Sequence, residues 1–170
     1  VLTEDHLVLT AYGWVAVKDV QGELIATGHI ALAGVAEEVF TGTVLGDGSI
    51  PKGCATLSLV HTEVSRDYVE LKAKALRVLT PHIARREGYQ SGSVRIKPQW
   101  SLRTQATLWI RQQRARWYTD DRRKVVPSDL NLTPLTIAVW FMDDGSTAFR
   151  THESAGHRPR SELAVCCFTR

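Results

Sequence analysis

The sequence is poor in cysteine and has no long apolar segment, and both absences exclude classes of protein. Its three cysteines, Cys54, Cys166 and Cys167, form no Cys-x-x-Cys pair. Adjacent cysteines rarely pair with each other, so we expect reduced thiols and no zinc site. No apolar run approaches the roughly 20 residues that a membrane-spanning helix needs, and no secretory signal is visible. We therefore expect an intracellular protein, in a microbial cytoplasm or an organelle, although a targeting segment could precede Val1.

The chain also has little net charge, but that charge is unevenly distributed. Its net charge is +3, whereas residues 82–124 contain eleven Lys/Arg and three Asp/Glu, a net of +8. The remaining residues therefore carry −5 (3 − 8). A basic block of this kind is typical of a protein that binds a polyanion. A solvated basic face is the alternative interpretation.

Two segments share one pattern, an apolar run followed by Asp-Gly-Ser. Residues 38–49 read EVFTGTVLGDGS and residues 133–146 read TPLTIAVWFMDDGS. Thr-Pro favours a helix start, and glycine is the usual helix terminator. We predict two helices, the first over residues 35–46, that end beside Asp47 and Asp144. An anion at a helix C-terminus is disfavoured by a few tenths to about 1 kcal/mol, so a bound cation is expected to compensate.

A single helix of this kind would be interpreted as a buried helix with an acidic end. Two of them, with aspartates 97 residues apart (144 − 47), favour two pseudo-equivalent halves that share one site. In the first helix Gly42 and Gly46 lie four residues apart on one face. Such small residues would permit the second helix to approach closely.

These segments resemble the two LAGLIDADG motifs of single-chain homing endonucleases in order, spacing and flanking sequence. The resemblance extends from about residue 39 to the C-terminus. It implies an α+β fold, a pseudo-dimer of αββαββα halves whose motif helices lie side by side and whose sheets form a concave DNA-binding surface. We expect the first half over residues 31–126 and the second over residues 127–170, which would be truncated. A full-length enzyme of this type would be a monomeric pseudo-dimer.

The resemblance also implies a catalytic site. Asp47 and Asp144 would hold divalent cations, most naturally Mg²⁺ or else Mn²⁺, because hard carboxylate oxygens suit these ions. The backbone carbonyls of Gly46 and Asp143 would add ligands, and the Asp143 side chain would cap the helix or support the metal ligands. Lys124, close before a Val-Pro pair, matches a catalytic lysine of one subgroup and would assist the water network or the phosphate charge.

The function implied is site-specific hydrolysis of double-stranded DNA at a long recognition site. Three alternatives remain at this point. A protein of the same fold could bind DNA or RNA without cleaving it, as a maturase or a regulator. The chain could be a splicing element, or the helix pair could be purely structural.

Residues 93–104 (SVRIKPQWSLRT) alternate between apolar and polar side chains, which predicts a half-buried strand region. Pro98 marks a turn or bulge, so a hairpin is one interpretation. The polar face suits a DNA major groove, although an amphipathic strand that faces water is the alternative. A second alternating strand is predicted over residues 54–61, with Leu57 and Leu59 on its buried face. The predicted DNA-contact residues of both regions are Lys52, Thr56, Ser58, Arg95, Lys97, Gln99, Ser101 and Arg103.

The remaining regular structure follows from helical spacing. A helix over residues 66–79, capped by Ser65, would place Tyr68, Leu71, Ala75 and Leu79 in the core. A helix is predicted over residues 105–118, with Trp109 and Trp117 assigned to the core. After the second motif, residues 147–160 are predicted to form a polar loop and residues 162–168 a strand.

Residues 1–30 are predicted to form a short β-rich unit. Residues 2–20 resemble the end of an intein splicing domain, in which a Thr-x-x-His block, here Thr3 and His6, precedes a strand, a Gly-Trp turn and another strand. The splice-junction Cys or Ser and the C-terminal His-Asn pair of that family are absent. The resemblance therefore implies a remnant of a splicing domain that cannot splice.

Overall fold

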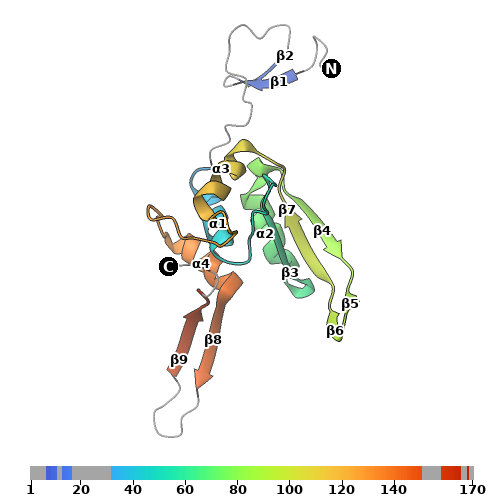
Figure 1. Ribbon diagram of the computed structural model, residues 1–170, viewed down its shortest axis with the longest axis vertical. Coiled ribbons are helices and arrows are strands. Elements are labelled where there is room, and N and C mark those ends of the chain that lie inside the picture. The colour runs from blue at the N-terminus through green and yellow to red at the C-terminus, as the bar shows by residue number, and fades with distance from the viewer. Residues whose placement is uncertain (1–6, 11–12, 17–31, 151–157, 166–167, 169–170) are drawn as a thin grey trace.

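The computed structural model describes residues 7–10, 13–16, 32–150, 158–165 and 168. In these ranges it contains a small N-terminal hairpin, four α-helices and three antiparallel sheets (Figure 1). The helices are α1 (Val35–Leu45), α2 (Arg66–Ala75), α3 (Leu108–Trp117) and α4 (Pro134–Asp144). The strands are β1 (Leu7–Thr10), β2 (Gly13–Ala16), β3 (Ser58–Thr62), β4 (His82–Arg86), β5 (Tyr89–Ser91), β6 (Val94–Ile96), β7 (Gln99–Arg103), β8 (Gly145–Arg150) and β9 (Arg158–Leu163). None of the described helices is long and apolar enough to cross a membrane.

The two motif helices, α1 and α4, lie side by side as predicted (Figure 1). The hydroxyl of Thr133 accepts the backbone N–H of Thr136 at 3.2 Å, so this residue caps α4 and Pro134 occupies the first turn. Gly42 lies at the crossing of the helices, because a Cβ there would be 2.6 Å from the carbonyl oxygen of Thr136. The absence of a side chain on this glycine is thus what allows the two backbones to approach.

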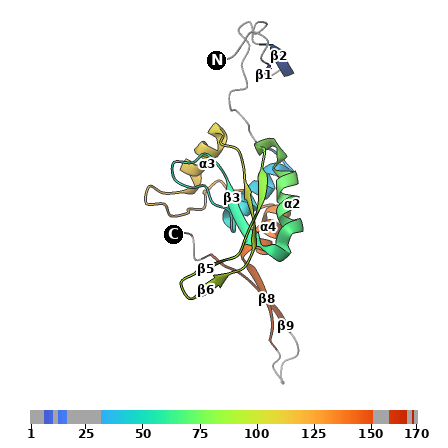
Figure 2. The ribbon, with the colours of Figure 1, turned by 90° about the vertical axis from the view of Figure 1, so that its right-hand side faces the viewer.

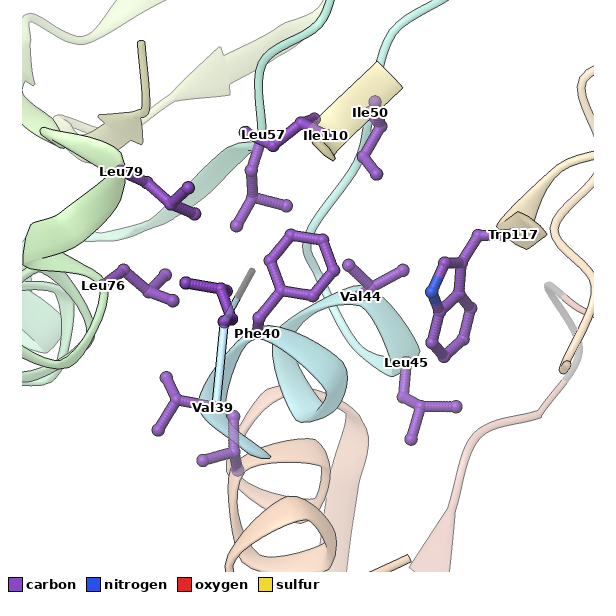
Figure 3. Close-up of a cluster of buried hydrophobic side chains, with 12 residues drawn as sticks. Val39, Phe40, Val44, Leu45, Ile50, Leu57, Leu76, Leu79, Ile110 and Trp117 are labelled. Atoms are coloured by element: carbon purple, nitrogen blue, oxygen red, sulfur yellow. The ribbon is translucent and has the colours of Figure 1, made fainter. Parts of the chain in front are cut away.

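The largest apolar core surrounds Phe40 of α1 and extends to Val139 of α4. Phe40 lies at the centre of a cluster in Figure 3, with Leu57 and Ile110 above it and Leu76 beside it. The edge of its ring contacts Trp109 at a centroid distance of 4.6 Å. Trp117 is also buried, so the prediction that both tryptophans belong to the core is confirmed. This core fixes α1 relative to the sheet and to α3.

The main sheet has the strand order β3-β7-β4, and α2 packs against one of its faces. Leu59, Val69 and Leu102 form the small core between them. The hairpin interpretation of residues 93–104 is wrong, because β7 pairs with β3 and β4, and β6 pairs with β5. The chain does break at Pro98, as predicted, and the β5–β6 hairpin continues the sheet as an arm (Figure 1). A further hairpin, β8–β9, begins directly at the end of α4 and points away from the helices (Figure 2).

Several predicted boundaries are corrected. The helix predicted over residues 66–79 ends at Ala75, followed by a 3₁₀ turn at Arg77–Leu79, and Leu71 is exposed. The prediction that Leu79 lies in the core is confirmed, and Ala75 packs against that core, but the fully buried side chains before them are Val69, Lys72 and Leu76. Ser65 precedes this helix but makes no capping hydrogen bond. The strand predicted over residues 54–61 is β3, which begins only at Ser58.

Further corrections concern the ends of the described chain. Residues 145–150, expected mainly as loop, form β8, and the last strand covers residues 158–163 instead of 162–168. The expected N-terminal strands are present as β1 and β2, but Gly13 and Trp14 lie in β2 and not in a turn. Thr3 and His6 lie outside the described residues.

Candidate active site

The C-terminal ends of α1 and α4 bring together acidic and basic side chains from both predicted halves. Gly46 and Asp143 precede Asp47 and Asp144, respectively, so they occupy equivalent places in the two motifs. They are also in contact, because a Cβ on Gly46 would lie 2.4 Å from the Cβ of Asp143. The two predicted metal-binding aspartates therefore flank a single contact point, at the end of each helix where the dipole is negative.

Asp47 and Asp144 both have a raised pKa. Burial and the neighbouring Asp143 carboxylate raise the pKa of Asp47, while Lys72 and Lys124 act in the opposite sense. Burial and then Asp47 raise the pKa of Asp144, and Lys124 again opposes them. Two like charges held this close favour protonation or a bound cation. The arrangement is suited to a divalent ion with oxygen ligands.

Lys124 reaches this site from the loop that follows α3. Its Nζ donates a hydrogen bond to the carbonyl oxygen of Gly46 at 2.8 Å, and its ammonium partly opposes the burial that raises the pKa of Asp47 and of Asp144. The structure thus brings Lys124 together with the two aspartates named from the sequence. The Gly46 carbonyl, expected to bind metal, already accepts this hydrogen bond.

The Asp143 side chain lies behind Asp47, where it can support a metal ligand, which is one of its two predicted roles. Its side chain is fully buried, and both carboxylate oxygens accept hydrogen bonds from Lys72 Nζ at 2.7 Å. The hydroxyl of Tyr68 donates to Asp143 Oδ1 at 2.9 Å, and the backbone N–H of Asp47 donates to Asp143 Oδ2 at 3.3 Å. Asp143 therefore links α4 to α2 and to the end of α1.

His61, on β3, completes the cluster. Its Nδ1 lies 3.4 Å from Asp47 Oδ2, and its Nε2 lies 3.5 Å from Asp143 Oδ1. Burial and then Lys72 lower the pKa of His61, which favours the neutral ring. Asp47, His61 and Asp143 each offer a ligand atom within 4.8 Å of the others. Because Lys72 contacts both oxygens of Asp143, the carboxylate of this group that remains available to a cation is that of Asp47.

The sequence interpretation missed His61, Tyr68 and Lys72. Tyr68 was assigned to the core, yet its hydroxyl bonds to Asp143, and burial with Asp143 raises its pKa. Lys72 is the clearest signal in retrospect, because a lysine falls in the apolar stripe of α2. Burial lowers the pKa of Lys72, and the Asp143 carboxylate opposes that effect.

The predicted DNA-contact residues divide into six that are exposed or half-buried and two that are buried. Arg103 and Gln99 lie on the face of β7 opposite to Leu102, which packs on α2, and Arg103 is exposed. Arg95 and Lys97 are exposed on the β5–β6 arm, and in the described part of the chain these two and Arg103 form no ion pair. Lys52 is exposed in the loop after α1, and Ser58 is half-buried on β3.

Ser101 and Thr56 are corrections to that prediction. Ser101 is buried, and its hydroxyl donates to the carbonyl of Ala84 at 3.1 Å on the neighbouring strand β4. Thr56 is buried because the segment before β3 is covered by the start of α3, where Thr107 N–H donates to the carbonyl of Ala55 at 2.9 Å. Neither hydroxyl is available to DNA in this arrangement.

Comparisons with known proteins give two kinds of similarity. Residues 37–170 match the model of the LAGLIDADG DNA endonuclease family. Two curated relatives are both named Protein RecA: that of Mycobacterium gastri is 26% identical over 178 residues, and that of Mycobacterium shimoidei is 29% identical over 177 residues. Each alignment covers 96% of the chain but 40% and 39% of the relative, respectively, so the chain spans well under half the length of these proteins.

A solved structure supports the fold. The homing endonuclease I-WcaI bound to its DNA recognition sequence superposes with a TM-score of 0.55 and 22% sequence identity. The match covers 68% of this chain and 53% of that one. It confirms the predicted α+β fold with antiparallel sheets, at an identity that carries fold information alone.

Proposed function

The chain belongs to the LAGLIDADG DNA endonuclease family, and from this premise we propose that it is the metal-binding and DNA-cleaving part of a site-specific endonuclease. The observation that carries the proposal is the convergence of Asp47, Asp144 and Lys124 at the paired ends of α1 and α4. Burial and neighbouring carboxylates raise the pKa of both Asp47 and Asp144, and such a pair fits a hard divalent cation, Mg²⁺ or Mn²⁺.

In the proposed mechanism, a divalent ion would activate water and stabilise the leaving oxygen of the phosphodiester. Asp47 and Asp144 would hold the ion, each from one motif helix. Lys124 would stabilise the negative charge that develops on the phosphate, because its ammonium acts electrostatically on both carboxylates. The position of Lys124 is set by its hydrogen bond to the Gly46 carbonyl.

The uncovered face of the sheet and the β5–β6 arm would bind the DNA. The register places Arg103 beside Ser58 on β3 and His82 on β4, and Gln99 beside Thr62 and Arg86. This face is thus lined by polar and basic side chains, while the opposite face packs on α2. Basic side chains at this spacing contact phosphates and base edges in a major groove.

The proposal is tested with Asp47→Asn and Asp144→Asn in the full-length protein, on a randomised duplex library with Mg²⁺. Both changes should abolish cleavage and leave DNA binding largely intact, because each removes a ligand charge and little contact area. Asp120→Asn, an exposed change in the loop before Lys124, is the matched control. A native protein that binds a specific duplex without cutting it would instead support the silent DNA-binding alternative.

We infer, as a second proposal, that the chain is part of an intein. The RecA matches cover 96% of the chain, so they include residues ahead of the family match at residue 37. A mobile element that carries an endonuclease and interrupts a host coding sequence would produce both kinds of similarity. The intein hypothesis predicts RecA coding sequence in frame on both sides of this segment in the genome. A stand-alone gene would contradict it.

A further inference from the structure

The two motif helices are equivalent in sequence pattern, but they are not equivalent where they touch. The residue before the metal-binding aspartate is glycine in α1 and aspartate in α4. The Asp143 carboxylate fits there only because Gly46 has no side chain: a Cβ on Gly46 would lie 2.6 Å from Asp143 Oδ2. The second motif thus extends a carboxylate across the contact point, and the first motif provides the space for it.

That carboxylate is held rigidly and in one direction. The side chains of Lys72 and Asp143 are both 0% exposed, and the two 2.7 Å bonds from Nζ fix both oxygens. One oxygen, Oδ2, then accepts the backbone N–H of Asp47. This N–H lies just beyond the end of α1, where the backbone has no helical partner to hold it. Asp47 is therefore anchored by a chain of contacts that begins on α2 and passes through α4.

We propose that Lys72 and Asp143 are positioning residues that fix Asp47 for metal binding, with Asp143 acting through its hydrogen bond to the Asp47 backbone. The inference rests on the proposed endonuclease function, since Asp47 is the ligand that it concerns. Hydrogen-bonded groups behind metal ligands commonly contribute about 10- to 100-fold to metal affinity. Asp144 has no such anchor from α1, because the equivalent residue is Gly46.

A purely structural buried ion pair is the competing explanation, and paired substitutions separate the two. A single Lys72→Met change is a poor test, because it leaves Asp143 buried without its cation. The double variant Lys72→Met/Asp143→Leu removes both charges, and leucine has the branched shape of aspartate but no acceptor. Lys72→Met/Asp143→Asn also removes both charges, but it keeps an oxygen for the Asp47 N–H.

The asparagine variant can satisfy its new amide group. The Tyr68 hydroxyl lies 3.1 Å from the carbonyl of Val139, so it can donate there and accept from the amide. The Asp47 N–H, the other neighbour of the new amide side chain in this variant, can then donate to the amide oxygen. The two double variants therefore differ mainly in the acceptor offered to Asp47.

The measurement is Mn²⁺ affinity of the 170-residue chain, read from the electron paramagnetic resonance signal of free Mn²⁺, with folding monitored by circular dichroism. The leucine variant should lose about 10- to 100-fold in affinity, and the asparagine variant should recover most of it. Gly46→Ala tests the same contact from α1 and should lose affinity similarly, because its Cβ displaces Asp143 Oδ2.

Equal, native-like Mn²⁺ affinity in both double variants would overturn the positioning role and leave a structural ion pair. Equal loss in both would also overturn it, since the acceptor would then not matter. Asp47→Asn serves as the reference for a lost ligand. If this change does not weaken Mn²⁺ binding in the native background, the metal site of the proposed function fails. That outcome is distinct from failure of the positioning role alone.

Discussion

The substitution Gly42→Ala tests the packing on which the proposed site depends. Inside an exposed helix this change is stabilising by about 1 kcal/mol, because glycine has a poor helix propensity. Gly42 is buried in the middle of α1, and the new Cβ would lie 2.6 Å from the Thr136 carbonyl oxygen and 2.7 Å from the Val139 Cβ. Neither is the end of a flexible side chain, so α1 and α4 must move apart.

The expected size of the effect follows from these opposing terms. Overpacking typically destabilises a protein by about 1–3 kcal/mol, and for a clash with backbone atoms we take the upper end of this range, about 3 kcal/mol. Subtracting the propensity gain of about 1 kcal/mol leaves a net destabilisation of about 2 kcal/mol. For a domain of this size, that corresponds to a fall in the melting temperature of roughly 4–8 °C.

Thermal and urea unfolding followed by far-ultraviolet circular dichroism measure this directly. Gln112→Ala, on the exposed side of α3, places the same residue in a helix without a clash and should change stability by less than about 0.5 kcal/mol. A Gly42→Ala protein as stable as the native one would refute the close contact between the two helices, and with it the geometry of the site.

Three further predictions concern the proposed activity. Arg103→Ala should weaken DNA binding and lower the salt slope by about one if it contacts a phosphate, as measured by fluorescence anisotropy across a salt series. Arg66→Ala is the control, because Arg66 lies on the α2 side, 5.0 Å over the Trp100 ring, and its loss should change neither quantity. Lys124→Met should slow cleavage more than it weakens binding, because its contact strengthens as charge develops on the phosphate; equal losses in single-turnover rate and affinity would make it a phosphate anchor. Asp144→Asn should raise the melting temperature of the metal-free protein at pH 7 and abolish the stabilisation by Mg²⁺. A carboxyl whose pKa is higher in the folded than in the unfolded state destabilises the folded protein fully above its folded-state pKa and not at all below its unfolded-state pKa. The gain in melting temperature from Asp144→Asn should therefore vanish below pH 3.8, the ordinary pKa of an aspartate. An unchanged Mg²⁺-induced shift in scanning calorimetry would contradict the last prediction.

The sequence was informative where local signals determine the structure. The Thr133 cap and the glycine after each apolar run placed both motif helices, and Gly42 and Gly46 predicted their close approach. Pro98 marked the break between β6 and β7, since proline cannot donate to a strand ladder. Each of these features depends on a few neighbouring residues.

The sequence was misleading where residues distant in the chain determine the pairing of a strand or the partner of a side chain. The pairing of β7 with both β3 and β4 depends on strands outside residues 93–104, so the turn expected at Pro98 suggested a hairpin within that segment. The alternation of the same segment assigned Ser101 to the DNA face, although the neighbouring strand uses its hydroxyl. Lys72 was overlooked because its partner Asp143 lies 71 residues away, so no neighbouring residue indicates what its ammonium binds.

The charges of the candidate site explain why two carboxylates can be held at the ends of two helices. Lys72 and Asp143 sum to zero whether the proton lies on the amine or the acid, so this buried pair adds structure without adding charge. Asp47, Asp144 and Lys124 together then carry −1, with His61 neutral. In the proposed function a divalent cation would convert that −1 to +1, which would attract a DNA phosphate. The unfavourable placement of the carboxylates would thus be offset when metal and DNA are both bound, and the half-buried Lys124 would be the lysine that faces the phosphate.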